Sequence, residues 1–150
     1  MPSRHLSRRR ALQLLYECDV RKIAPDDAIR DYYHTLYTEE NEGLPEPDAF
    51  METLLRGTFK EQELLDALIT RRSEHWKLER MPVVDRNLLR LAAFELLRTE
   101  TPAAVVIDEA IELARRFSGD ESARFVNGVL DAMRKGDEVV NRAERAGADS

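Results

Sequence analysis

The segment Asp85-Arg-Asn-Leu-Leu-Arg-Leu-Ala-Ala-Phe-Glu-Leu-Leu-Arg98 decides how the rest of the chain is interpreted. Its leucines and alanines recur at helical spacing and cover most of the circumference, which is typical of a helix surrounded by other helices. The apolar positions are Leu88, Leu89, Leu91, Ala92, Leu96 and Leu97. We therefore expect a helix from about Asp85 to Arg98 at the centre of a helical domain.

Other segments show the same periodicity, and none shows the sustained apolar–polar alternation of a strand. The chain is therefore predicted to be all-α, with about seven helices. Besides the central helix, they are expected at about 7–21, from 25 onward, at 48–60, 61–72 and 102–117, and from 120 onward. Ser7 is the expected N-cap of the first helix and Thr101 that of the sixth, which Gly119 ends. Leu64 and Phe117 are expected to face inward.

Length and composition describe a globular chain of 150 residues, 43% hydrophobic and 35% charged. That length suits one domain, or two small halves that share a core. The single cysteine, Cys18, excludes an internal disulfide and argues against an oxidising compartment. No apolar run approaches the roughly 20 residues of a membrane span. Glu17 and Asp19 also interrupt the apolar stretch that a secretory signal would need. We expect a cytoplasmic protein that is not associated with a membrane.

The positive charge is concentrated at the N-terminus. Four arginines and no acidic residue occupy the first ten positions, whereas the whole chain has 23 basic and 29 acidic residues and a net charge of −6. Without those ten, 19 basic residues stand against 29 acidic ones, so positions 11–150 carry −10. Attraction to a nucleic acid depends on such local concentration more than on net charge. A solvated cationic tail is the alternative that the charges alone leave open.

Candidates for catalysis are weak. The three histidines lack the helical spacing to carboxylates that a metal site needs. Cys18 lies on the apolar face of the first helix and is expected to be a buried small hydrophobe rather than a nucleophile. The acidic group at Asp108, Glu109 and Glu112 is typical of a solvated helix turn, and no glycine-rich phosphate loop is present. We expect no enzyme activity, no catalytic residue, no metal and no cofactor.

The residues of the first helix favour a nucleic-acid-binding surface. On a helix that starts near Ser7, the arginines at 8–10 occupy the first turn, where unbonded backbone N–H groups add to the attraction for phosphate. Gln13 and Tyr16 follow one and two turns later and offer an amide and an aromatic ring to an unpaired base. Core packing is an equal alternative for Tyr16, and Phe125 near the start of the last helix shares that ambiguity.

Four segments of the sequence identify a family: 11–16 (ALQLLY), 84–96 (VDRNLLRLAAFEL), 110–117 (AIELARRF) and 122–131 (SARFVNGVLD). Together they resemble the NusB family of bacterial transcription antitermination factors, over about residues 4–134. The FVNGVLD stretch is the most specific of these motifs.

The resemblance implies an all-helical domain at 1–135, made of two small helical subdomains at about 4–72 and 76–135. Residues 136–150 have no counterpart in it, and their small and charged composition predicts a disordered tail. The resemblance also implies binding of single-stranded boxA RNA in nascent ribosomal RNA transcripts, together with the ribosomal protein NusE. In the RNA polymerase antitermination complex, the two would promote transcription of ribosomal RNA operons.

The resemblance also assigns residues to the two ligands. The residues expected to bind RNA are Arg4, Arg8, Arg9, Arg10, Gln13, Tyr16, Glu121, Ser122, Arg124 and Phe125. The residues expected to bind the partner protein are Glu79, Arg80, Asp85 and Arg86. The arginine triplet lies nearer the helix than is usual in the family, so which arginines contact phosphate stays open.

Three alternatives remain. A NusB-like domain also forms the N-terminal part of some ribosomal RNA cytosine methyltransferases, but this chain ends where the catalytic domain would have to begin. A helical scaffold with incidental arginines would bind partners and no RNA. A homodimer is a third alternative, since Tyr32, Tyr37 and Phe59 on outer helix faces could form an apolar patch. A dimer through the first helix would mask the arginines.

Overall fold

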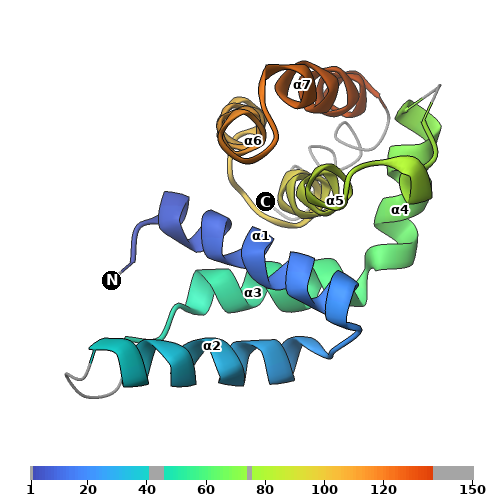
Figure 1. Ribbon diagram of the computed structural model, residues 1–150. Helices are drawn as coiled ribbons and strands as arrows, with labels where there is room; N and C mark the ends of the chain where they lie inside the picture. Colours follow the sequence, from blue (N-terminus) through green and yellow to red (C-terminus); the bar gives the residue numbers. More distant parts are fainter. Residues whose placement is uncertain (1, 41–45, 74–75, 137–150) are drawn as a thin grey trace. The chain divides into compact units, whose positions relative to one another are not determined.

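The computed structural model describes residues 2–40, 46–73 and 76–136, and every regular element within these ranges is a helix (Figure 1). The elements are α1 (Arg4–Arg21), α2 (Pro25–Glu40), α3 (Ala49–Lys60), α4 (Gln62–Arg72), the short 3-10 helix η1 (Leu78–Arg80), α5 (Val83–Arg98), α6 (Ala103–Phe117) and α7 (Asp120–Lys135). The prediction of an all-α fold with about seven helices is confirmed.

The helices divide into two compact units, Met1–Lys60 and Glu61 onward. The sequence placed the division later, between about 72 and 76. The difference is α4, which packs against α5 and α7 and so belongs to the second unit. An ion pair explains part of this association, because Arg90 of α5 binds Asp66 of α4 through Nε at 2.7 Å and through Nη2 at 3.0 Å. We describe each unit separately.

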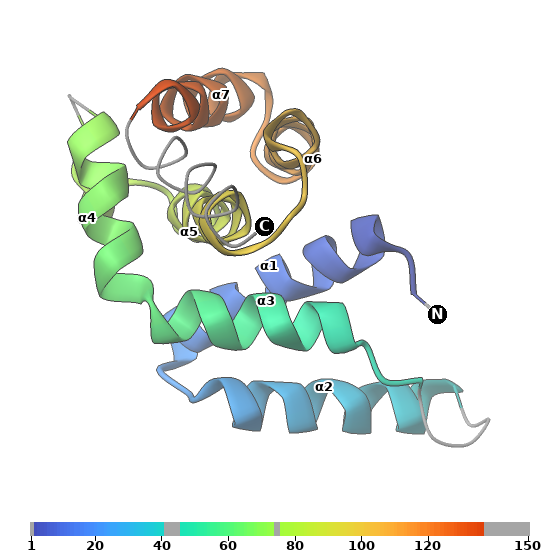
Figure 2. The ribbon, with the colours of Figure 1, turned by 180° about the vertical axis from the view of Figure 1, so that it is seen from behind.

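The first unit consists of α1, α2 and α3, with α1 packed against both other helices (Figure 2). A short connection joins α1 to α2. Lys22, the C-cap of α1, takes the left-handed conformation with φ 57°, and Pro25 begins α2. A proline suits this first position because its φ is already helical and its missing N–H has no intrahelical partner there. The buried apolar residues are Ala11, Leu12, Leu14, Leu15, Cys18, Ala28, Ile29, Met51, Leu54 and Leu55.

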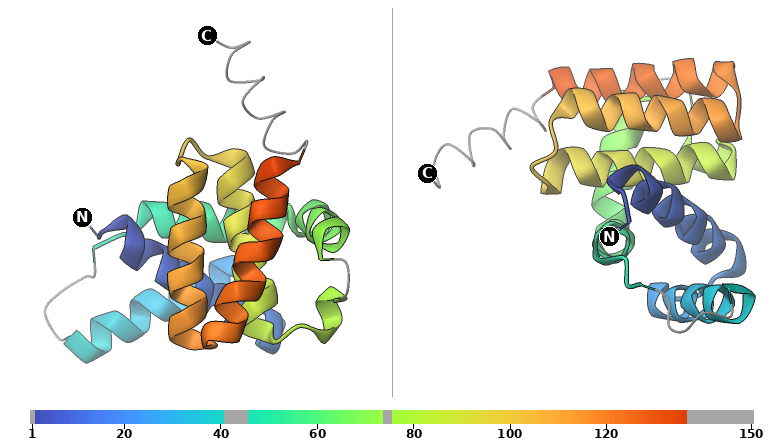
Figure 3. Two further views of the ribbon diagram at one scale, coloured as in Figure 1. Left: turned by 90° about the horizontal axis from the view of Figure 1, so that it is seen from above. Right: turned by 90° about the vertical axis from the view of Figure 1, so that its left-hand side faces the viewer.

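In the second unit, α5, α6 and α7 run with nearly parallel axes and pack on one another (Figure 3). Five of the six apolar positions that predicted a central helix are buried in α5, and the sixth, Leu97, is half-buried. The polar side chains of Asn87, Arg90 and Glu95 are buried there as well. The prediction that this helix lies at the centre of its neighbours is therefore correct for the second unit.

Two residues that were expected to face inward are exposed instead. Leu64 is 45% exposed and Phe117 is 48% exposed. Leu64 lies at the edge of the apolar face of α4, whose buried residues are Leu65, Leu68 and Ile69. Phe117 is the last residue of α6, where its ring lies 5.5 Å from the guanidinium of Arg116. Helical spacing predicts burial least well at the edge of an apolar face and at the end of a helix.

The ends of α6 differ in part from the prediction. Thr101 is not its N-cap: Pro102 occupies that position and the helix starts at Ala103. Gly119 does separate α6 from α7, with a φ of 102° that a residue with a Cβ rarely adopts.

No helix in the described ranges is long and apolar enough to cross a membrane. Residues 137–150 of the tail predicted at 136–150, and the side chain of Tyr37, lie outside the described residues.

Candidate nucleic-acid interface

Helix α1 begins one turn earlier than its sequence suggested. Ser3, not Ser7, is its N-cap: the Leu6 amide donates to Ser3 Oγ at 3.1 Å, and the Ser7 amide donates to the Ser3 carbonyl at 2.9 Å. The arginines at 8–10 therefore lie in the second and third turns, where their amide groups are used inside the helix. The prediction that unbonded backbone N–H groups lie beside this triplet and add to its attraction for phosphate is therefore wrong.

The arginines of α1 fall into different environments. Arg4 is exposed, and its guanidinium lies 3.9 Å from the centre of the Phe50 ring, which is a cation–π distance. Arg8 is only 6% exposed, with its guanidinium 5.5 Å from the same ring. Arg9 is partly exposed, and no ion pair links Arg4 or Arg9 to another residue in the described ranges. These two arginines have the positive charge that an RNA could still reach.

Arg10 is held inside the first unit by Asp48. Its Nη1 donates to Asp48 Oδ2 at 3.0 Å, while Asp48 Oδ1 accepts from the Ser7 hydroxyl at 2.6 Å and from the Met51 amide at 3.0 Å. The Asp48 side chain is 2% exposed and caps α3 through the Met51 contact. The guanidinium of Arg10 also lies 5.7 Å from the Tyr32 ring. Its charge is thus neutralised within the fold.

This arrangement continues into a second set of polar contacts between α2 and α3. The Tyr33 hydroxyl accepts from the Asp48 amide and donates to Glu52 Oε2, both at 2.9 Å. Burial is the largest effect on both neighbouring tyrosines and raises the pKa of Tyr32 and of Tyr33 above the ordinary value. Both rings stay neutral at physiological pH and serve as hydrogen-bonding and packing groups.

An accessible stripe runs along the side of α1 that faces away from its buried residues. Arg9, Gln13 and Tyr16 are spaced at i, i+4 and i+7, so they lie on one face of the helix. Gln13 is exposed and Tyr16 is 41% exposed, which excludes core packing as the main role of this tyrosine. The structure therefore brings three of the predicted RNA-binding residues together and separates Arg10 from them.

In the second unit, the predicted residues gather at the beginning of α7. Glu121 and Arg124 are exposed, whereas Ser122 and Phe125 are partly buried. Ser122 faces inward, and its hydroxyl donates to Asp85 Oδ2 at 3.0 Å. This bond joins α7 to the first turn of α5.

Asp85 does not belong to the surface, although the sequence assigned it to the partner interface. It is 4% exposed, and its Oδ1 is buried with no hydrogen-bond partner among the described residues. A carboxylate in the first turn of a helix is favoured by the helix dipole, which helps to explain how this one is tolerated. Glu79 and Arg80 of η1 are exposed and Arg86 is partly exposed. The accessible part of that group is therefore η1.

Trp76 is an exposed aromatic residue that the sequence analysis did not select as a candidate. This residue is 55% exposed, and its ring lies 6.5 Å from the ring of Phe125, in an edge-to-face arrangement with the planes at 74°. Its backbone is held by Ser73: the Trp76 amide donates to the Ser73 carbonyl at 2.9 Å, and the Ser73 hydroxyl donates to the Trp76 carbonyl at 3.0 Å. An aromatic residue in a connector was the available signal, but its neighbour on α7 was not predictable.

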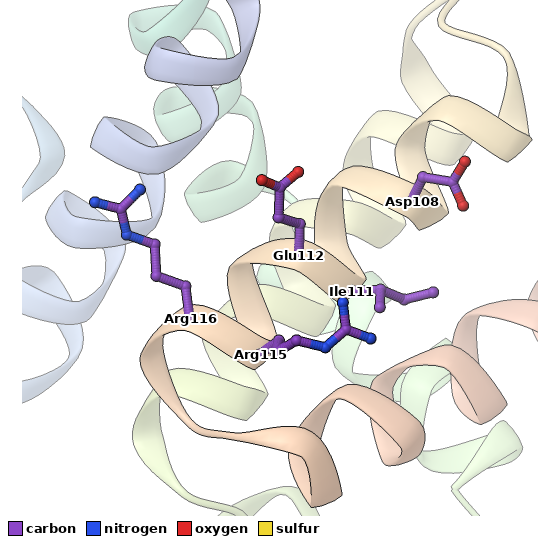
Figure 4. A pocket seen from close by; sticks show the side chains of 5 residues that line it. All are labelled: Asp108, Ile111, Glu112, Arg115 and Arg116. Atoms are coloured by element: carbon purple, nitrogen blue, oxygen red, sulfur yellow. The ribbon is translucent and has the colours of Figure 1, made fainter.

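A hollow on α6 is a poor candidate for catalysis. Figure 4 shows the side chains that line it, all from this one helix: Asp108, Ile111, Glu112, Arg115 and Arg116. The carboxylates of Asp108 and Glu112 do not point toward each other, and Arg115 binds Asp120 through Nε at 3.2 Å. Asp108 and Glu112 are exposed and do not face a common point where they could act together on a substrate. They are solvated surface groups, as the sequence predicted.

Comparison with known proteins decides the family. A sequence model of the NusB family matches residues 5–135. The transcription antitermination protein NusB of Solibacter usitatus is 56% identical over 135 residues, which cover 90% of each chain. NusB of Anaeromyxobacter dehalogenans is 43% identical and covers 93% of this chain and 95% of that protein. The chain belongs to the NusB family. This membership confirms the predictions of a transcription antitermination factor and of a protein that is not an enzyme.

Solved NusB structures share the fold. T. maritima NusB is 31% identical and aligns with a TM-score of 0.74 over 96% of this chain and 99% of its own. Another structure, described as the antitermination factors NusB and NusE in complex with dsRNA, is 28% identical and aligns with a TM-score of 0.71 over 88% of this chain and 96% of its own. The NusB fold therefore accounts for the whole described part of the chain.

Proposed function

We propose that this protein binds the boxA sequence of nascent ribosomal RNA transcripts together with the ribosomal protein NusE. As part of the RNA polymerase antitermination complex, it would promote transcription of ribosomal RNA operons in the cytoplasm. The observation that carries the proposal is the accessible stripe of Arg9, Gln13 and Tyr16 on α1, in a NusB-family chain. The relative solved with NusE and dsRNA supports the binding of NusE and of RNA.

The chemistry of the two units suggests a division of tasks. Arg4 and Arg9 supply charge for phosphates, which sets affinity and its dependence on salt. Tyr16 offers a ring to an unstacked base, and Gln13 can donate to or accept from a base edge. In the second unit, Glu121, Arg124 and Phe125 at the start of α7 offer further base and phosphate contacts. The buried Arg8 and the partly buried, ion-paired Arg10 support the fold instead.

A titration of labelled boxA RNA tests the proposal directly. We expect tighter binding to boxA than to a scrambled RNA of the same length, and a further gain when NusE is added. Equal affinity for the two RNAs, with and without NusE, would contradict it.

The proposed partner surface is tested by removing charges from η1. Because Glu79 and Arg80 are exposed, Glu79→Ala and Arg80→Ala should weaken NusE binding without unfolding the protein. Glu63→Ala, in the first turn of α4, is the matched control because Glu63 is also an exposed acidic residue. Sedimentation with and without boxA RNA tests the homodimer: RNA that leaves a dimer population unchanged excludes competition at α1.

A further inference from the structure

The exposed aromatic pair of the second unit has features that the α1 surface lacks. Trp76 and Phe125 come from separate parts of the chain and meet edge to face at 6.5 Å, and Trp76 is 55% exposed. Two hydrogen bonds to the buried Ser73 fix the Trp76 backbone. An aromatic side chain that is held in place but left exposed loses little conformational freedom when a ligand stacks on it.

The surroundings favour a nucleic-acid base over a protein as the occupant. Leu78 and Met81, the next apolar residues along the connector, are buried. Exposed charged residues flank the two aromatic residues in the sequence: Lys77, Glu79 and Arg80 follow Trp76, and Glu121 and Arg124 precede Phe125. A stable protein interface needs a contiguous patch of about 800 Å² on each partner, with an apolar centre. A single unpaired base needs only one ring, and stacking tolerates charged neighbours.

Glu121 supplies the polar contact that such a base would need. It lies one turn before Phe125 on α7, so the two share a face of the helix, and its side chain is exposed. A carboxylate repels phosphate but accepts hydrogen bonds from the amino groups on base edges. The acidic first turn of α7, with Asp120 and Glu121, therefore suits a base and not the RNA backbone.

We infer that one unpaired RNA base stacks on the ring of Trp76, which Phe125 supports through its edge-to-face contact, while Glu121 accepts a hydrogen bond from the amino group of that base. The inference rests on the proposed RNA-binding function and adds Trp76 to it as a base-contacting residue. Phosphate contacts then set the salt dependence, and this aromatic pair contributes to the choice of sequence.

The chain reports on the site by itself because Trp76 is its only tryptophan. Addition of boxA RNA to the full chain should change the tryptophan fluorescence, with the same midpoint as the anisotropy of labelled RNA. Trp76→Ala should weaken RNA binding about fivefold or more, as expected for the loss of one stacked base, without changing the slope against salt. Trp76→Phe, which keeps an aromatic ring, should restore most of the affinity.

An abasic scan of the RNA identifies the base. Removing one base at a time should weaken binding to the wild-type chain at one position that no longer matters in Trp76→Ala. Leu64→Ala is the matched control, since Leu64 is also an exposed apolar side chain of the second unit. It should bind RNA as the wild type does.

The outcomes separate this inference from the proposed function. Normal boxA affinity in Trp76→Ala, with no fluorescence change in the wild type, would overturn the inference and leave RNA binding in place. A loss of NusE binding in Trp76→Ala with unchanged RNA binding would also overturn it, because the pair would then be a protein contact. A wild-type chain that binds no RNA at all would overturn the proposed function and this inference together.

Discussion

Arg10 and Asp48, which are 38 residues apart in sequence, form an ion pair of 3.0 Å between the side of α1 and the start of α3. The same carboxylate accepts the Ser7 hydroxyl at 2.6 Å. The buried Asp48 thus binds two residues of the cationic N-terminal segment, Ser7 and Arg10. Its negative charge neutralises that of Arg10, so Arg10 adds little to the attraction for RNA. The remaining accessible charge belongs to Arg4 and Arg9.

Arg10→Ala should reduce stability more than RNA binding. The substitution leaves Asp48, which is 2% exposed, without its cationic partner. Since the Arg10 side chain is itself 19% exposed, we expect a loss of about 1–3 kcal/mol rather than the larger cost of a fully buried pair. Urea unfolding measures the loss, and the slope of RNA affinity against salt should not change. A slope lower by about 0.7 would show that Arg10 contacts phosphate.

Arg4→Ala should have the opposite effect. Its guanidinium is exposed over the Phe50 ring, so its loss removes a cation without leaving a buried charge unpaired. We expect the salt slope to fall by about 0.7 and the free energy of unfolding to change by less than about 1 kcal/mol. Arg30→Ala is a suitable control, because Arg30 is an exposed cation of the same unit that pairs with Asp27 on α2. An unchanged slope in Arg4→Ala would remove this arginine from the interface.

Ser122→Ala should destabilise the second unit by about 1–3 kcal/mol. The Ser122 hydroxyl is the hydrogen-bond donor to Asp85 Oδ2, and Asp85 Oδ1 already has no partner. Thermal unfolding measures the loss. Asp85→Asn combined with Ser122→Ala should cost less than the two single losses added together, because the buried charge is gone. Strict additivity in this double-mutant cycle would contradict direct coupling of the pair.

Cys18 should be unreactive in the folded protein. Burial, with a smaller contribution from Glu17, raises the pKa of its thiol from 9.0 to about 11. At pH 8 the thiolate is therefore about a hundredfold scarcer than in the unfolded chain. Modification by iodoacetamide should be slow in buffer and fast in urea. Because the folded thiol holds its proton at higher pH than the unfolded one, this group should lower stability as pH rises from about 9 to 11. A Cys18→Ala variant should lack that part of the pH dependence.

Local sequence signals predicted most of the fold. Helical spacing of leucine and alanine identified the α5 segment as central, and proline and glycine marked the ends of helices at Pro25 and Gly119. These signals act over a few residues, so they can be recognised without knowledge of the tertiary structure. They were less accurate at helix ends, where Ser3 rather than Ser7 is the cap and where Phe117 is exposed.

The residues of the site divide in the same way. Motifs along the chain predicted the NusB family and pointed to Arg9, Gln13 and Tyr16, whose common face follows from helical periodicity alone. Only the packed structure shows that Asp48 neutralises Arg10, that Asp85 is buried against Ser122, and that Trp76 meets Phe125. Each of these pairs joins two separate elements of the fold. Whether a charged or aromatic side chain reaches solvent depends on the neighbours that tertiary packing brings to it, and those neighbours are distant in sequence.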